Sequence, residues 1–137
     1  MLFGLGVPNL ILQSPTIAGG AWETAAPASN VASWALADTA VSVNALAAST
    51  ELTYNWAGPV SARALVLAGH NLSAAATVRW KRGSTDGGTD TADSGSVAAW
   101  RFTPRVYDGG QFNVIVLLPT AGAALWDRIE ITDTTNP

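Results

Sequence analysis

Short runs of alternating apolar and polar residues recur along this chain, and turn-forming residues separate them. The most informative run, 63–68, is instead continuously apolar at Leu65, Val66 and Leu67, which indicates a buried strand, and it ends at Gly69, a residue free to adopt positive φ. A second run, 77–81, places Val78 and Trp80 on one face. Alternation with a period of two is typical of β-strands that bury one face. The pattern therefore predicts a strand, a tight turn and a second strand.

Similar runs occur along the rest of the chain, and helical periodicity is almost absent. The turn formers Gly58 and Pro59 end one run and Pro119 ends another, so each predicts the end of a strand. About eight short strands with regular turns favour an all-β, antiparallel β-sandwich over an α/β fold. The predicted strands are 9–13, 41–45, 52–56, 63–68, 77–81, 96–102, 112–118 and 128–132.

The phase of these runs also predicts which side chains form the core. Residues two apart on a strand share a face, so the apolar members of each run should point inward together. The side chains predicted to be largely buried are Leu65, Leu67, Val78, Trp80, Val114, Val116, Ile129 and Ile131.

Three motifs carry a resemblance to a known family. The first is Gly-His-Asn-Leu-Ser at 69–73, which follows a strand and precedes an Ala-Thr-Val-Arg strand. The second is Leu-Trp-Asp-Arg-Ile-Glu-Ile-Thr-Asp at 125–133, followed by Asn-Pro, and the third is Asn-Val-Ala-Ser-Trp at 30–34. Together they resemble the galactose-binding-like, or discoidin-like, β-sandwich domains of tailed-bacteriophage virion proteins. The resemblance implies a jelly-roll domain over 30–137, with 1–29 as an N-terminal arm or lead-in strand.

The composition adds an argument about association. A length of 137 residues fits one domain with a real core. The chain is 48% hydrophobic but only 12% charged, against about 25% in ordinary soluble domains. A surface so poor in charge protects a monomer badly against association. We therefore expect neighbours in an assembly to cover much of this surface.

The charge pattern argues against two other kinds of partner. A formal net charge of −3 gives no electrostatic footprint for nucleic acid. The only basic cluster, Arg79, Lys81 and Arg82, is interpreted as a solvated strand end. The apolar segment 1–12 lacks a positive region and is interrupted by glycine and proline, which favours an ordered arm or first strand over a signal peptide or membrane span. The chain has no cysteine, so disulfides and thiolate metal sites are excluded.

One polar segment, 83–96, contains candidate metal ligands. The carboxylates of Asp86, Asp90 and Asp93 could coordinate a hard cation such as calcium. Their spacing matches no known calcium-loop template, which favours a polar loop instead. Discoidin-like domains often hold a structural cation near a loop, so the resemblance keeps structural calcium as an alternative.

Catalytic chemistry finds little support in the sequence. His70 is the only histidine, and no Gly-x-Ser-x-Gly motif accompanies it. We interpret it as a turn histidine that donates to the backbone. Nothing in the sequence brings two of the acidic residues, such as Glu23, Glu51 and Glu130, together as a glycosidase pair. The prediction is therefore a protein that is not an enzyme and uses no cofactor.

The six tryptophans are the remaining candidates for recognition. Trp56 and Trp80 are in phase with apolar strand residues and are assigned to the core. Aromatic rings can also stack on sugars, which makes the other four candidates for a carbohydrate site: Trp22, Trp34, Trp100 and Trp126. Trp22 and Trp34 lie in loop-like sequence and could equally contact a neighbouring subunit.

One departure from the family bears on assembly. In similar domains the Asn-Pro pair is followed by another strand or two, whereas here the sequence ends at Pro137. A sandwich without that strand would have an open edge, which a neighbouring subunit or the chain's own segment 9–13 could cover.

These observations predict a structural subunit of a tailed-phage virion that acts through contacts with other virion proteins and copies of itself. A tail-associated role in the tail tip, a fibre or an adaptor is favoured. The alternatives are a capsid-decoration protein and a carbohydrate-binding module that recognises host surface glycans. Nucleic acid and membrane are not expected as partners.

Overall fold

The computed structural model describes residues 16–32, 38–67, 70–100 and 114–135. Neighbouring strands in its single five-stranded sheet are all antiparallel, in the order β1-β2-β5-β3-β4. One 3-10 helix, η2 (Ala28–Ala32), accompanies the sheet, and within the described ranges no helix has the length and apolarity to span a membrane. The all-β antiparallel prediction is confirmed. The strands are β1 (Thr16–Ala18), β2 (Leu52–Leu67), β3 (Thr77–Gly83), β4 (Ala92–Ala98) and β5 (Val114–Thr132).

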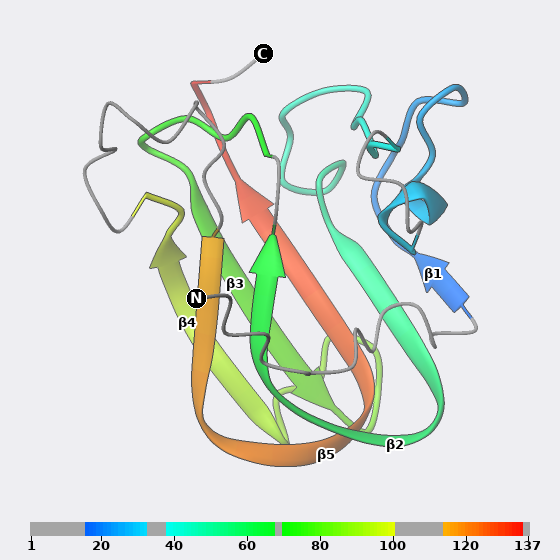
Figure 1. Cartoon of the computed structure of the whole chain (residues 1–137), viewed down its shortest axis with the longest axis vertical. Helices are drawn as coiled ribbons and strands as arrows, with labels where there is room; N and C mark the ends of the chain where they lie inside the picture. The colour runs from blue at the N-terminus through cyan, green and yellow to red at the C-terminus, as the bar shows by residue number, and fades with distance from the viewer. Residues whose placement is uncertain (1–15, 33–37, 68–69, 101–113, 136–137) are drawn as a thin grey trace, which may run out of the picture.

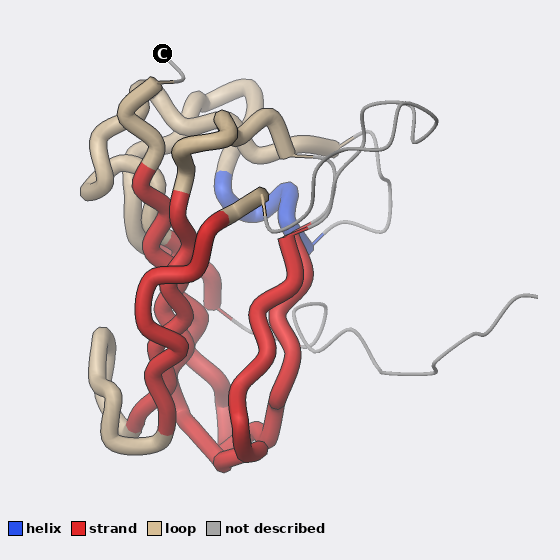
Figure 2. Tube along the Cα trace, turned by 90° about the vertical axis from the view of Figure 1, so that its left-hand side faces the viewer, coloured by secondary structure: helices blue, strands red, loops and turns tan. Residues whose placement is uncertain are grey.

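Two of these strands are long and bent, and their bends fold the sheet into a sandwich (Figure 1). The first part of β2 and the last part of β5 lie beside β1, β3 and β4, and these segments form what we call the broad layer. Beyond the bends, residues 64–67 of β2 pair with residues 114–117 of β5 and form the two-stranded layer. Figure 2 shows the two layers edge-on, joined at the bends.

The bends explain why fewer strands exist than the turn formers predicted. Gly58, Pro59 and Pro119 do not end strands as expected, because β2 and β5 continue through them. The pairing of β2 with β5 skips between Asn55 and Val60, and again opposite Pro119, where the register shifts. Both prolines thus occupy stretches without ladder pairing, where a missing N–H costs no hydrogen bond. Two pairs of predicted strands are therefore two continuous strands.

The other predicted strands have mixed outcomes. The segment 41–45 is not a strand and makes only one isolated bridge, between Ser42 and Trp22. Its apolar side chains do not pack into the core, since Val41 and Val43 are both nearly half exposed. The strand predicted at 96–102 begins earlier, as β4, and its last two residues lie outside the described part of the chain. The predicted strand 9–13 also lies outside it.

The core lies between the two layers, and the predicted inward face is largely correct. Leu67 and Ile131 are partly buried against the core, and nothing is described of the Val114 side chain. The remaining five predicted core residues are fully buried: Leu65, Val78, Trp80, Val116 and Ile129. Trp56 and Tyr54 join them, with their rings stacked at a centroid separation of 6.1 Å.

The two edge strands of the sheet, β1 and β4, differ in length and in regularity. On one side, the three-residue β1 pairs with β2, so a segment shortly after the predicted 9–13 occupies that edge. On the other side, β4 pairs with β3 through an irregular register, and Gly95 has φ of +63° at the irregularity. Bulges and charged side chains protect edge strands against further pairing. Both occur here, since the charged Asp93 lies at the irregularity and accepts the Gly95 N–H at 2.9 Å.

Candidate functional site

The most completely buried polar group of the described residues is Arg82, which contradicts its interpretation as part of a solvated strand end. Arg82 is 0% exposed, and its Nε donates to Asp127 Oδ1 at 2.6 Å. The indole N–H groups of Trp56 and Trp80 donate to the same carboxylate, at 2.8 and 3.2 Å. The Arg82 guanidinium also lies 5.2 Å from the Trp80 ring centroid, within cation–π range. A fully paired charge network thus sits inside the sandwich.

The same arginine holds the bends of the two long strands. Its terminal nitrogens donate to the carbonyls of Val60 and Ala62 on β2 and of Gly122 on β5, each at 2.7 Å. Buried charges are tolerated when every polar atom finds a partner, and this guanidinium meets that condition. The Arg82–Asp127 network therefore joins the two layers and has a structural role.

The sequence contains a signal for this network that the charge analysis overlooked. Arg82 follows Val78 and Trp80 at a spacing of two, and Asp127 precedes Ile129 at the same spacing. Strand periodicity alone would have placed both charged side chains on the inner face. Burial, and then the Asp127 carboxylate, raise the pKa of the neighbouring Tyr54, which keeps that hydroxyl protonated.

Two of the three family-like motifs meet at one end of the sandwich. Asp133, at the end of β5, accepts hydrogen bonds from the Ser73 backbone N–H at 2.7 Å and from the Ser73 hydroxyl at 2.6 Å. The Trp100 indole N–H donates to the Leu72 carbonyl at 2.8 Å. The turn 70–73 is therefore tied both to the C-terminal motif and to the segment after β4. The third motif, 30–34, lies only in part within the described residues.

His70 occupies this turn but uses its ring differently from the expectation. It accepts a hydrogen bond from the Leu72 backbone N–H at Nδ1, at 3.2 Å, rather than donating to the backbone. Its Nε2 is buried and has no hydrogen-bond partner within the described residues. The ring meets Trp100 edge-on at 6.5 Å. Burial lowers the pKa of His70, which favours the neutral imidazole.

The three candidate calcium ligands are engaged separately. Asp86 pairs with Arg128 at 2.8 Å, and Asp93 pairs with Arg79 through two hydrogen bonds. Asp90 accepts the Ser84 backbone N–H, and this bond lowers the pKa of its carboxyl. The Arg79 contact holds the pKa of Asp93 at about 2. In the ranges that the structure covers, no cluster of three or more acidic or histidine side chains could hold a metal ion.

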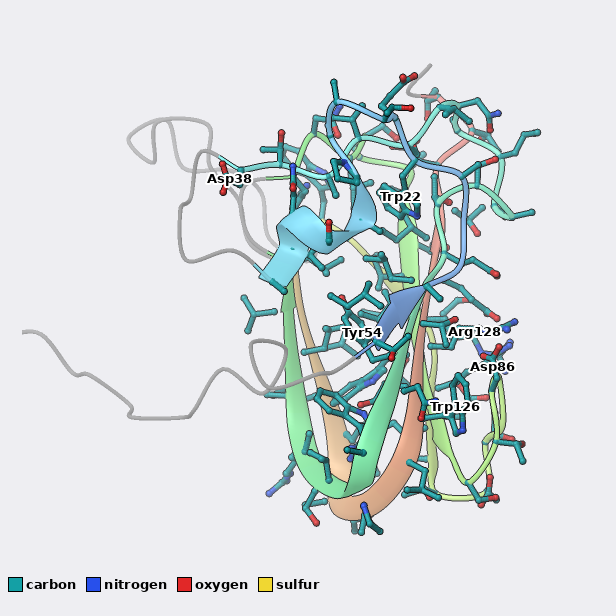
Figure 3. All side chains as sticks on the ribbon, turned by 90° about the vertical axis from the view of Figure 1, so that its right-hand side faces the viewer. Trp22, Asp38, Tyr54, Asp86, Trp126 and Arg128 are labelled. Atoms are coloured by element: carbon teal, nitrogen blue, oxygen red, sulfur yellow. The ribbon has the colours of Figure 1, made fainter. Side chains whose placement is uncertain are left out.

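The predicted contact tryptophans are less informative. Trp22 is half-buried against the core, and its indole N–H donates to the Gly19 carbonyl at 2.9 Å. It lies in the lead-in segment after β1, as Figure 3 shows. Trp34 lies outside the described residues. Because it is partly buried, Trp22 exposes less of its ring to a glycan or a neighbouring subunit than a fully exposed tryptophan would.

The outer face of the broad layer carries several ion pairs. Lys81 on β3 pairs with Glu130 on β5 at 2.5 Å, beside the Arg79–Asp93 pair. Arg128 on β5 pairs with Asp86 and also lies 3.7 Å from Glu51. Cross-strand pairs of this kind add little stability but keep a surface hydrated.

The outer face of the two-stranded layer is apolar. Val66 is 50% exposed and Leu117 is 62% exposed. Leu117 lies opposite Ala64 in the ladder, so Ala64, Val66 and Leu117 share this face, which we call the apolar face. The sequence has no charged residue from Ala64 to Leu67 or from Val114 to Trp126. The described residues thus combine a charged outer face on one layer with an apolar one on the other.

The chain matches no protein-family model, no curated protein and no solved structure. The case for a function therefore rests on the residues and their geometry.

Proposed function

We propose that the chain is a structural subunit of a tailed-phage virion, associated with the tail as a tip, fibre or adaptor component. The class of protein comes from the resemblance of the motifs at 69–73 and 125–133. Ser73 and Asp133 bring these two motifs into contact, although they are 60 residues apart in sequence. The mechanism is complementarity of shape and surface between subunits, without a cofactor.

The apolar face is the observation that carries this proposal. Leu117 and Val66 keep half or more of their surface in contact with water, and Ala64 between them is also exposed. Complete burial of one such aliphatic side chain is worth about 1.5–3 kcal/mol. Covering Leu117 and Val66 together would therefore supply a useful part of the free energy of a subunit contact. The buried centres of subunit interfaces are more apolar than the rest of a protein surface.

The low charge of the chain agrees with this role. The ion pairs on the broad layer leave that face hydrated, so association should be directed to the other layer. A subunit that exposes one apolar face and one charged face can attach to a neighbour without aggregating on all sides.

The test is to locate the chain in the particle of the phage whose genome encodes it. Mass spectrometry of purified particles should detect the chain, and a cryo-electron microscopy map should place the sandwich in the tail with Leu117 covered by a neighbouring subunit. Density on the outer surface of the head would instead favour the capsid-decoration alternative. Absence of the chain from purified particles would contradict a structural role altogether.

A further inference from the structure

Trp126 differs from the other tryptophans that the structure describes. Four of them donate their indole N–H to a protein acceptor: Trp22, Trp56, Trp80 and Trp100. The indole N–H of Trp126 donates to no described residue, although its ring is only partly exposed on β5. A half-buried indole usually finds a hydrogen-bond partner, which makes this free donor notable.

The side chain of the residue opposite Trp126 on β2 also makes no hydrogen bond to a described residue. Asn55 is the ladder partner of Trp126, so the two side chains lie on the same, outer face of the broad layer. Within the described part of the chain, the Asn55 carboxamide has no hydrogen-bond partner, although the residue is half-buried. An aromatic ring and an amide thus lie side by side with their polar groups unused.

The loop after β3 borders Trp126 on its other side. Gly83, the β3 partner of Trp126, has no side chain, and the loop packs directly over it, since a Cβ there would clash with Asp90 Oδ1 and would lie 2.8 Å from the Gly88 carbonyl carbon. Figure 3 shows Trp126 beside Asp86 and Arg128, near this loop. The ring is therefore flanked by Asn55 on one side and by a polar loop on the other.

Charged groups complete the surroundings. Arg128 follows Trp126 on the same face of β5 and pairs with Asp86 at 2.8 Å and Glu51 at 3.7 Å. One guanidinium facing two carboxylates leaves a local charge of about −1, which disfavours an anionic ligand. The surface around Trp126 combines an aromatic ring with several hydrogen-bonding groups and has no excess positive charge.

We propose that Trp126 and Asn55 form a binding site for a neutral saccharide on the outer face of the broad layer. The apolar face of a pyranose ring would stack on the indole, and its hydroxyls would exchange hydrogen bonds with the Asn55 amide and the Trp126 N–H. The carboxylate of Asp86, at the border of the site, can accept a further hydroxyl. This site lies on the layer opposite the apolar face, so its existence does not depend on the proposed assembly role.

Nuclear magnetic resonance on the full chain labelled with nitrogen-15 tests this site directly. The probes are the methyl glycosides of galactose, glucose and N-acetylglucosamine, added separately. We expect at least one of them to shift the indole resonance of Trp126 and the side-chain amide of Asn55, while the indole resonance of the half-buried Trp22 stays in place. The resonances of Trp56 and Trp80 report whether the core is intact.

Substitutions then separate stacking from hydrogen bonding. Trp126→Ala should abolish the saccharide-dependent shift at Asn55, and Asn55→Ala should weaken binding about fivefold, as expected for one neutral hydrogen bond. Trp126→Phe retains a ring and serves if the alanine variant does not fold; it should bind more weakly than wild type. Trp22→Phe is the matched control and should bind as wild type does. If none of the probes shifts Trp126, or if Asn55 still responds in Trp126→Ala, the proposal is wrong.

Discussion

The two layers of this sandwich share two strands, yet their outer faces have opposite character. The broad layer carries three cations in ion pairs, namely Arg79, Lys81 and Arg128. The two-stranded layer presents Ala64, Val66 and Leu117 instead, with no charged residue in its paired segments. The difference follows from the bends, since the same strand β5 is uncharged before its bend and carries Asp127, Arg128 and Glu130 after it.

This contrast indicates how a chain with only 12% charged residues can keep one of its faces hydrated. Concentrating them on one face keeps that face in water, and the other face remains available for a neighbour. The joint between the layers is the exception. There a buried pair, Arg82 and Asp127, is enclosed by indoles and backbone carbonyls.

The largest effect is expected from breaking that joint. Asp127→Asn leaves the Arg82 guanidinium buried without its counter-charge, and removing one partner of a buried pair costs about 3–5 kcal/mol. Urea denaturation followed by tryptophan fluorescence should show a loss of this size in the free energy of unfolding.

Arg82→Met provides the complementary measurement. It should be similarly destabilising, because the buried Asp127 carboxylate loses its counter-charge. The carbonyls of Val60, Ala62 and Gly122 also lose their hydrogen-bond donor. A loss below about 1 kcal/mol in both variants would mean that the layers do not depend on this pair.

The joint also shows what the sequence could and could not predict. Strand periodicity correctly predicted the inward-facing Val78, Trp80 and Ile129, because a period of two directly reflects side-chain direction. The same periodicity included Arg82 and Asp127, but their charge argued for the surface, and only tertiary structure supplies the partners that make burial possible.

The bends and the surroundings of Trp126 could not be predicted from the sequence for a related reason. Proline usually interrupts a strand, and only the register shared by β2 and β5 reveals that Pro59 and Pro119 fall where no ladder bond is needed. Trp126 was one of four candidates for sugar stacking. Its free indole and its neighbour Asn55 are distinguished from the others only by cross-strand pairing.

A smaller effect is expected at the end of the sandwich where the turn after β2 meets the broad layer. The folded-state pKa of His70 lies below its ordinary value of 6.5, so its contribution to stability is complete above that pH and is lost as the pH falls below it. Protonation of Nδ1 would break the bond from the Leu72 N–H, which is worth about 0.5–1.5 kcal/mol.

His70→Asn is the informative variant, since its side-chain oxygen can accept the same N–H without titrating. Thermal unfolding from about pH 7.5 to about pH 5 should show a decline for wild type that is reduced in the variant. Parallel declines in the two proteins would assign the pH dependence to other groups.

The smallest effect is expected on the charged face. The pKa of Asp93 is lowered to about 2, chiefly by the Arg79 hydrogen bond, so its contribution is present above the ordinary carboxyl pKa and disappears as the pH falls toward 2. Asp93→Asn should cost less than about 1 kcal/mol at neutral pH, because the pair is partly exposed. The difference from wild type in urea denaturation should vanish at low pH, and a cost comparable to that of Asp127→Asn would contradict the contrast between buried and surface pairs.

The central claim is that the apolar face mediates subunit contacts, and light scattering of the purified chain tests it most directly. Wild type should form multimers, and Leu117→Glu should shift it to monomer, because the contact would then bury an unpaired carboxylate in place of an apolar side chain. Ser96→Glu is the matched control, because it adds the same charge at an exposed site beside Arg79 on the broad layer, and it should associate as wild type does. Association that is unchanged in Leu117→Glu, or a wild-type chain that is a highly soluble monomer, would contradict the account.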